Sequence, residues 1–168
     1  MTQLIYHPAF DPFNALLRIV RLLEAIEVGI DATALQIGEF FLLFPERIID
    51  ARWTPKLRGQ VVRAGLQARY PYDRLPSSRI VFERMEPAHQ AALQTLISRG
   101  FVTLDKDGRV KLNSETMPVE VLDLAAAHNK KELGLMTLLI EILQAFPIVG
   151  SNGLKDRSKL MEFRYDVA

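Results

Sequence analysis

The stretch over residues 86–112 constrains the fold of this chain more than any other. Apolar residues recur at helical spacing after Pro87, and proline suits the first position of a helix. Gly100 follows at the place where a left-handed helix cap is expected. Two alternating runs then flank Asp107-Gly108, which predicts a β-hairpin over residues 101–112. A helix, a glycine break and a hairpin form the second half of a winged helix.

Capping signals predict further helices along the rest of the chain. Asp11 and Asp31 each precede a helical pattern, where an aspartate accepts hydrogen bonds from the first turn. The pattern after Asp31 is apolar nearly all round, so we expect that helix to be buried among several others. The predicted helices run from Pro12 to a stop at Gly29, over 32–44, over 55–68, from Pro118 to about 127 with an interruption at His128-Asn129, and over 132–146.

These patterns together predict a mainly α fold with a small β-hairpin. We expect one winged-helix-containing helical domain over residues 1–168, because this length suits a single core. The winged-helix part spans roughly residues 32–113, and the C-terminal helices and tail span 118–168. Residues 79–82 predict a strand beside the hairpin, and Leu133 is predicted to be buried by the last helix.

The composition indicates an ordinary soluble protein. Hydrophobic residues make up 49% of the chain and charged residues 24%, which is typical of globular domains. There is no cysteine, which excludes disulfides and thiolate metal sites and fits a reducing cytoplasm. No basic and then apolar leader is present, and no apolar run is long enough to cross a bilayer. We therefore expect a cytoplasmic protein without a membrane partner.

No pattern of catalytic residues is present. His7, His89 and His128 are far apart in sequence, and none has a second ligand at zinc-site spacing. We expect these histidines at surface or capping positions. The chain has neither a cysteine nucleophile nor the glycine-flanked serine of a nucleophile elbow. The sequence therefore predicts no enzymatic activity, no cofactor and no catalytic or metal site.

The charge is unevenly distributed along the chain. The formal net charge is only +1, yet residues 46–84 hold nine Lys/Arg against four Asp/Glu. This block is either a solvated surface whose charges pair with acidic neighbours or a patch that faces DNA phosphates or an acidic partner. The candidate contact residues, including those near the hairpin, are Arg52, Lys56, Arg58, Arg63, Arg69, Arg99, Lys106, Arg109 and Lys111.

The helix before the hairpin offers few side chains that read bases. Its polar face carries His89, Gln90, Gln94, Thr95 and Arg99, whereas a DNA-reading helix usually shows more positive charge. The winged helix therefore favours protein contacts. Non-specific DNA contact within a complex is the second interpretation, and direct sequence reading is the third.

The C-terminal tail alternates apolar and charged residues. Met161, Phe163 and Tyr165 alternate with Glu162, Arg164 and Asp166, a pattern typical of an extended segment. Such a segment docks on a sheet edge of its own domain or on a partner. The first alternative is favoured, because three large apolar side chains are costly to leave exposed in a free subunit.

Three stretches carry a resemblance to a known family. They are residues 6–13 (YHPAFDPF), residues 40–45 (FFLLFP) and residues 153–166 (GLKDRSKLMEFRYD). Together with the helix and hairpin at 87–112, they make the chain resemble a middle component of bacterial ABC-three-component systems. That group includes the Lamassu antiphage systems.

The resemblance implies an accessory subunit of an SMC-like ABC ATPase. It implies a second partner, an effector that is often a nuclease, which the middle component restrains or positions. DNA would be contacted through the complex. No functional residue can be carried over from the family to this chain. The rival interpretations are a winged-helix transcriptional regulator, which would need a dimer and a base-reading helix, and an adaptor of toxin–antitoxin or phage origin.

Overall fold

The computed structural model describes residues 6–69 and 75–161, and it is mostly helical with a small antiparallel sheet. The predicted mainly α fold is confirmed. The elements are η1 (Pro8–Phe10), α1 (Pro12–Ala25), β1 (Ile30–Asp31), α2 (Ala32–Leu43), η2 (Pro45–Asp50), α3 (Pro55–Ala64), α4 (Ser78–Ser98), β2 (Val102–Leu104), β3 (Arg109–Leu112), α5 (Val119–Lys131), α6 (Leu133–Ala145) and α7 (Leu154–Ser158).

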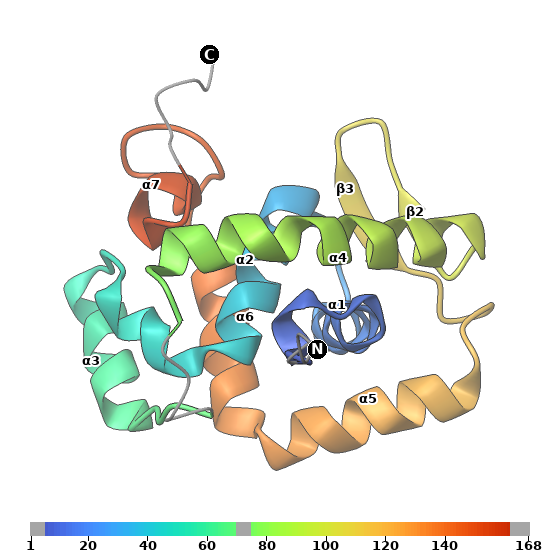
Figure 1. Ribbon diagram of the computed structural model, residues 1–168, viewed down its shortest axis with the longest axis horizontal. Coiled ribbons are helices and arrows are strands. Elements are labelled where there is room, and N and C mark those ends of the chain that lie inside the picture. Colours follow the sequence, from blue (N-terminus) through green and yellow to red (C-terminus); the bar gives the residue numbers. More distant parts are fainter. Residues whose placement is uncertain (1–5, 70–74, 162–168) are drawn as a thin grey trace, which may run out of the picture.

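Helix α1 lies at the centre of the arrangement, between α4 on one side and α5 on the other (Figure 1). Helices α2 and α6 pack beside it, and α3 packs on the outer side of α6. The β2–β3 hairpin stands at one end of the molecule, near the end of α4, and α7 stands at the opposite end. Helix α3 also lies at the end of the molecule opposite the hairpin (Figure 1).

Helix α2 is buried on nearly every side, as its apolar pattern predicts. Phe40 and Phe41 are at most 1% exposed and contact rings from other elements. The ring centroid of Phe40 lies 5.9 Å from that of Phe82, and the centroid of Phe41 lies 6.1 Å from that of Trp53. Burial of each such side chain contributes about 1.5–3 kcal/mol of stability. The core is therefore built around α2.

The predicted helix caps are present. The Asp11 carboxylate accepts a hydrogen bond from the Phe13 backbone N–H at 2.9 Å, and the Asp31 carboxylate accepts one from Thr33 at 2.7 Å. Two predicted helix ends were too late. Helix α1 ends at Ala25 rather than at Gly29, because Ile26 turns extended and is buried. Helix α3 ends at Ala64 rather than near 68, because Gly65 adopts the left-handed conformation with φ 56°.

Helix α4 begins nine residues earlier than predicted. It starts at Ser78 and contains Pro87, so the strand predicted over 79–82 and the helix start at Pro87 were wrong. The residues Val81, Phe82 and Met85 are buried at helical spacing, which places one face of this first half in the core. Pro87 lies exposed inside the helix, where it donates no backbone hydrogen bond.

Helix α5 continues through the predicted interruption at His128-Asn129 and ends at Lys131. The Asn129 side chain accepts a hydrogen bond from Arg21 Nε at 3.0 Å and donates one to the Arg21 carbonyl at 2.8 Å. It also donates to Glu24 at 2.7 Å. An asparagine with these buried partners stays helical despite its modest intrinsic helix propensity.

The predicted hairpin is confirmed, and the described residues add a third strand that the sequence reasoning missed. Strand β3 pairs antiparallel with β2 and also with β1, with Ile30 opposite Val110, so the sheet order is β1-β3-β2. The Asp105 carboxylate accepts hydrogen bonds from the backbone N–H groups of Asp107 and Arg109, each at 2.9 Å. Strand β1 lies just before the predicted winged-helix part at 32–113, whose assignment stays a prediction.

A buried charge cluster joins α1, α2 and α4. One Glu39 carboxylate oxygen accepts hydrogen bonds from Arg18 Nη2 at 2.8 Å and Nε at 3.1 Å. The other oxygen contacts His89 Nδ1. Glu39 and His89 are both 1% exposed, so the expectation of a surface or capping His89 was wrong. His7 does cap η1, because its Nδ1 accepts from the Ala9 N–H at 3.1 Å.

We predict that Glu39→Gln destabilises the protein strongly. The substitution leaves the buried Arg18 guanidinium without its counter-charge, which costs about 3–5 kcal/mol. Glu83→Gln is the matched control, since Glu83 forms an exposed ion pair with Arg79 on α4. The control should cost less than about 1 kcal/mol. Urea unfolding measures both free energies, and equal values for the two variants would contradict the role given to Glu39.

Candidate functional site

The predicted contact residues fall into two separate groups. One group lies on or near α3 and consists of Arg52, Lys56, Arg58, Arg63 and Arg69. The other lies at the hairpin end of the molecule and consists of Arg99, Lys106, Arg109 and Lys111. Figure 1 shows α3 and the hairpin at opposite ends. The nine side chains therefore do not form one continuous basic surface.

Several cations of the α3 group are held in ion pairs. Arg52 pairs with Asp156, a buried residue of α7. Lys56 pairs with Glu141 at 2.9 Å, and Arg69 pairs with Glu132. Pairing with acidic neighbours, one of the two alternatives open from the sequence, is thus correct for these three residues. Their charges attach α3 and its flanking segments to α6 and α7.

Other predicted cations have no ion-pair partner among residues 6–69 and 75–161. These are Arg58, Arg63, Arg99, Lys106 and Lys111, and all five are exposed. Arg109 differs from them, because its guanidinium donates to the Gly29 carbonyl across the sheet. The free cations are the ones available to an external ligand.

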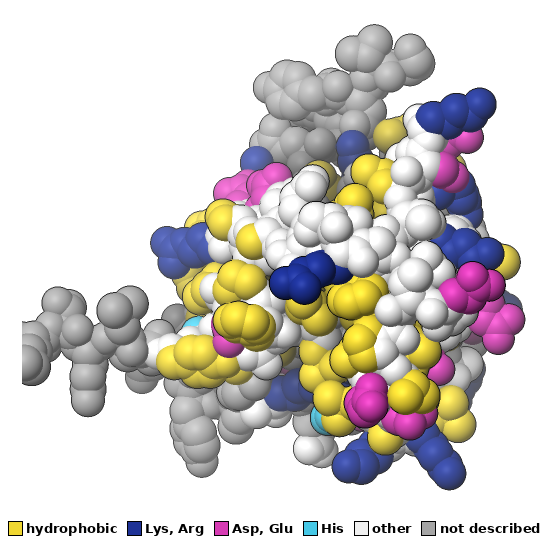
Figure 2. All heavy atoms as spheres, turned by 90° about the vertical axis from the view of Figure 1, so that its right-hand side faces the viewer, with side chains coloured by type: hydrophobic (Ala, Val, Ile, Leu, Met, Phe, Trp, Pro, Cys, Tyr) yellow, Lys and Arg dark blue, Asp and Glu magenta, His cyan; other side chains and the backbone are white. Residues whose placement is uncertain are grey.

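Figure 2 views the hairpin end of the molecule directly. Among the described residues in this view, the Lys and Arg side chains are spread between hydrophobic side chains and backbone. Acidic side chains lie beside several of them. Phosphate-binding surfaces usually gather cations on one face, whereas the cations in this view lie among acidic and hydrophobic side chains.

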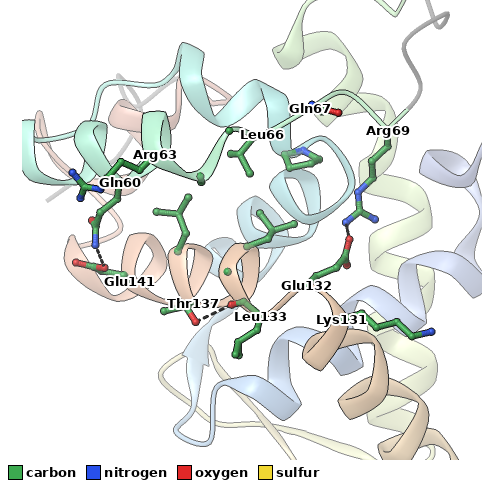
Figure 3. Close-up of a pocket in the computed structure, with 16 residues that line it drawn as sticks. Gln60, Arg63, Leu66, Gln67, Arg69, Lys131, Glu132, Leu133, Thr137 and Glu141 are labelled. Atoms are coloured by element: carbon green, nitrogen blue, oxygen red, sulfur yellow. Dashed lines mark hydrogen bonds and ion pairs between the residues drawn. The ribbon is translucent and has the colours of Figure 1, made fainter.

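A groove lies between α3 and α6, and we call it the α3–α6 groove. It encloses about 900 Å³ and is lined mainly by aliphatic side chains, together with polar groups at its ends. Figure 3 shows Gln60 and Glu141 at one end, Arg69 and Glu132 at the other, and Leu66 and Leu133 between them. The remaining apolar side chains of the lining are those of Pro45, Ala64, Leu135 and Leu138.

Leu133 gives the groove its exposed apolar wall. Its side chain is 65% exposed, so the prediction that α6 buries Leu133 was wrong. Gly134 follows in the first turn of α6, and a Cβ atom placed there would meet no heavy atom within 4 Å. The groove is therefore wide at this point. Sequence reasoning missed it because its walls, α3 and α6, are about eighty residues apart.

Hydrogen bonds and ion pairs hold the polar ends of the groove in place. Glu141 accepts from Gln60 Nε2 at 2.6 Å and from Lys56 at 2.9 Å. The pKa of the Glu141 carboxyl lies below its ordinary value. The hydrogen bond from Lys56 is the largest cause, and the hydrogen bond from Gln60 is the second. Glu132 contacts Arg21 Nη2 at 2.6 Å as well as Arg69. Both acids of the groove are thus already engaged.

The C-terminal part before residue 162 packs on the protein itself. Leu154 and Leu160 are at most 1% exposed, and Met161 is half-buried against the core. Residues 154–158 form helix α7, where the sequence indicated no helix. Phe163 and Tyr165 lie outside the described residues, so the predicted docking of the tail through them stays a prediction.

The described residues also lack the features of two other kinds of site. Within the part of the chain that the structure describes, no group of His, Asp and Glu side chains has the arrangement of a metal site. No helix in the same part has the length and apolar character needed to cross a bilayer.

A protein-family model matches nearly the whole chain. The model of the family described as ABC-three component (ABC-3C) system Middle Component 5 matches residues 4–166. The chain belongs to this family. Searches among curated proteins and among solved structures found no match. The resemblance to ABC-three-component middle components is confirmed, while the narrower comparison with Lamassu systems stays a prediction.

We predict that Lys56→Met raises the pKa of Glu141. Because the pKa is lowered in the folded protein, this carboxylate makes its full contribution to the α3–α6 contact at pH values above the ordinary glutamate pKa. The contribution is lost as pH falls through the lowered value. Carboxyl ¹³C NMR titration measures the shift. Arg58→Met is the control, because Arg58 lies on the same helix without contacting Glu141. An unchanged Glu141 titration in Lys56→Met would show that this ion pair does not persist in solution.

Proposed function

We propose that this middle component is a non-catalytic accessory subunit of a cytoplasmic antiphage defence complex. In this proposal it binds an SMC-like ABC ATPase and positions or restrains an effector subunit, often a nuclease. The observation that carries the proposal is the family match over residues 4–166, which describes a component of a three-component system. A component of such a system acts through its protein partners.

The structure supports a binding role with an exposed apolar surface. Leu133 stands 65% exposed in a groove with further leucines, and soluble proteins that expose such surfaces commonly use them for partners. The groove lies at a distance from the hairpin, so the two ends of the molecule are able to meet different partners. This separation suits a subunit that lies between an ATPase and an effector.

The proposal retains the winged-helix part over roughly residues 32–113 and adds strand β1 to it. Its support is the element order, with a strand, helices and then a hairpin, together with the sheet order β1-β3-β2. The alternative of a transcriptional regulator has less support. His89, one of the side chains expected on the reading face of α4, is buried against Glu39. DNA contact in the proposal therefore comes through the assembled complex.

We expect the protein to co-purify with the ABC ATPase of its own system. The ATPase, this subunit and the third component are co-expressed, with a tag on the ATPase alone. Purification through that tag should give one species on size-exclusion chromatography. An ATPase from a different three-component system is the control and should not retain the subunit. Absence of association with the cognate ATPase, both with and without ATP, would contradict the proposed function.

A second prediction concerns DNA contact by the assembled complex. Charge reversal at Arg58, or at Lys106 together with Lys111, should weaken DNA binding equally for all sequences if that group faces phosphate. The plot of log affinity against log salt concentration has a negative slope. Each lost phosphate contact should make this slope shallower by about 1. Fluorescence anisotropy at several salt concentrations measures this slope. If neither variant changes it, the free cations of this subunit do not contact DNA.

A further inference from the structure

We propose that the α3–α6 groove binds an acidic amphipathic helix of about two turns, supplied by another component of the complex. This inference rests on the proposed function, because it names the surface and the kind of partner segment that the accessory role requires. Three features of the groove support it: its length, its lining and its charge.

The length of the groove fits a short helix. Its α6 wall extends from Leu133, at the Arg69–Glu132 end, to Glu141, at the Gln60 end. Eight helical steps of 1.5 Å make this wall about 12 Å long, which matches about two turns of a second helix. Gly134 widens the groove, because a Cβ atom there meets nothing within 4 Å. A helix backbone can therefore come close to α6 at this position.

The lining calls for apolar side chains at helical spacing. Leu66, Leu133, Leu135 and Leu138 supply an aliphatic surface between the two polar ends. A docked helix would cover this surface with residues at positions i, i+3 or i+4, and i+7. Nucleic acid fits poorly here, because the described lining residues include no aromatic side chain on which a base could stack, and two carboxylates lie at the ends of the groove.

The charged side chains of the groove indicate which charge the partner segment carries. Glu132 already contacts Arg21 and Arg69, and Glu141 already contacts Lys56 and Gln60. By contrast, the groove-lining cations Arg63 and Lys131 have no ion-pair partner within the described residues. Carboxylates at the ends of an incoming helix would meet these two cations at the rim of the groove, and both carboxylates of the described lining are already engaged. The groove therefore favours an acidic segment.

The first test fills the groove without disturbing the fold. Gly134→Leu adds a side chain in open space and replaces a glycine inside a helix, so its melting temperature should equal or exceed that of the wild type. Its affinity for the complex of the other two components should fall about tenfold or more. Ala127→Leu is the matched control, because Ala127 is exposed on α5 outside the groove. It should bind normally.

The second test reverses a charge at one of two adjacent lysines. Lys130 and Lys131 are both exposed in the last turn of α5, so Glu at either position has the same effect on the helix dipole. Only Lys131 lines the groove. Lys131→Glu should weaken binding at low salt, and Lys130→Glu should leave the affinity unchanged. Equal affinities of the two variants would overturn the acidic character given to the partner.

The third test identifies the bound segment. The chain has no cysteine, so Thr137→Cys introduces a unique thiol in the groove. A bifunctional maleimide–amine crosslinker and mass spectrometry should join it to an acidic segment with apolar residues at helical spacing. If the wild-type complex assembles but Gly134→Leu binds normally and no such segment is crosslinked, the groove assignment is wrong and the proposed function stands. If the wild-type complex does not assemble, both proposals are wrong.

Discussion

The architecture depends on one carboxylate buried within the apolar helix α2. Glu39 lies on α2 at 1% exposure, and its two oxygens contact Arg18 of α1 and His89 of α4. Arg18 also donates to the Pro8 carbonyl at 3.1 Å, which attaches η1 to the same cluster. A buried charge is tolerated only where its partners are correctly placed. The cluster therefore requires three helices to pack in one register, whereas hydrophobic contacts alone would tolerate several.

A second network of polar contacts connects the core to the surface. Arg21 lies one turn after Arg18 on α1, and its guanidinium contacts Asn129 of α5 and Glu132 at the start of α6. Glu132 in turn contacts Arg69, at the end of the groove. The groove wall is thus attached to the central helix by polar contacts. A partner bound there would meet a preformed surface, which lowers the entropic cost of binding.

Arginine has two distinct roles in this protein, and the sequence does not separate them. Arg18 and Arg21 are buried in the networks above, and Arg52 and Arg69 join segments distant in sequence. Arg58 and Arg63 look the same in the sequence, yet they are exposed and unpaired among the described residues. Net charge over a block of residues therefore overestimates the cations that a ligand is able to reach. The acids that neutralise them lie elsewhere in the chain.

The sequence by itself determined the features that depend on neighbours within a few residues. These are the caps at Asp11 and Asp31, the break at Gly100, the hairpin and the apolar helix α2, because local hydrogen bonds and periodicity specify them. Tertiary structure alone decided the early start of α4, the continuity of α5 at Asn129, strand β1 and the burial of His89. It also decided the α3–α6 groove. Each of these depends on contacts between segments far apart in sequence, which no local pattern encodes.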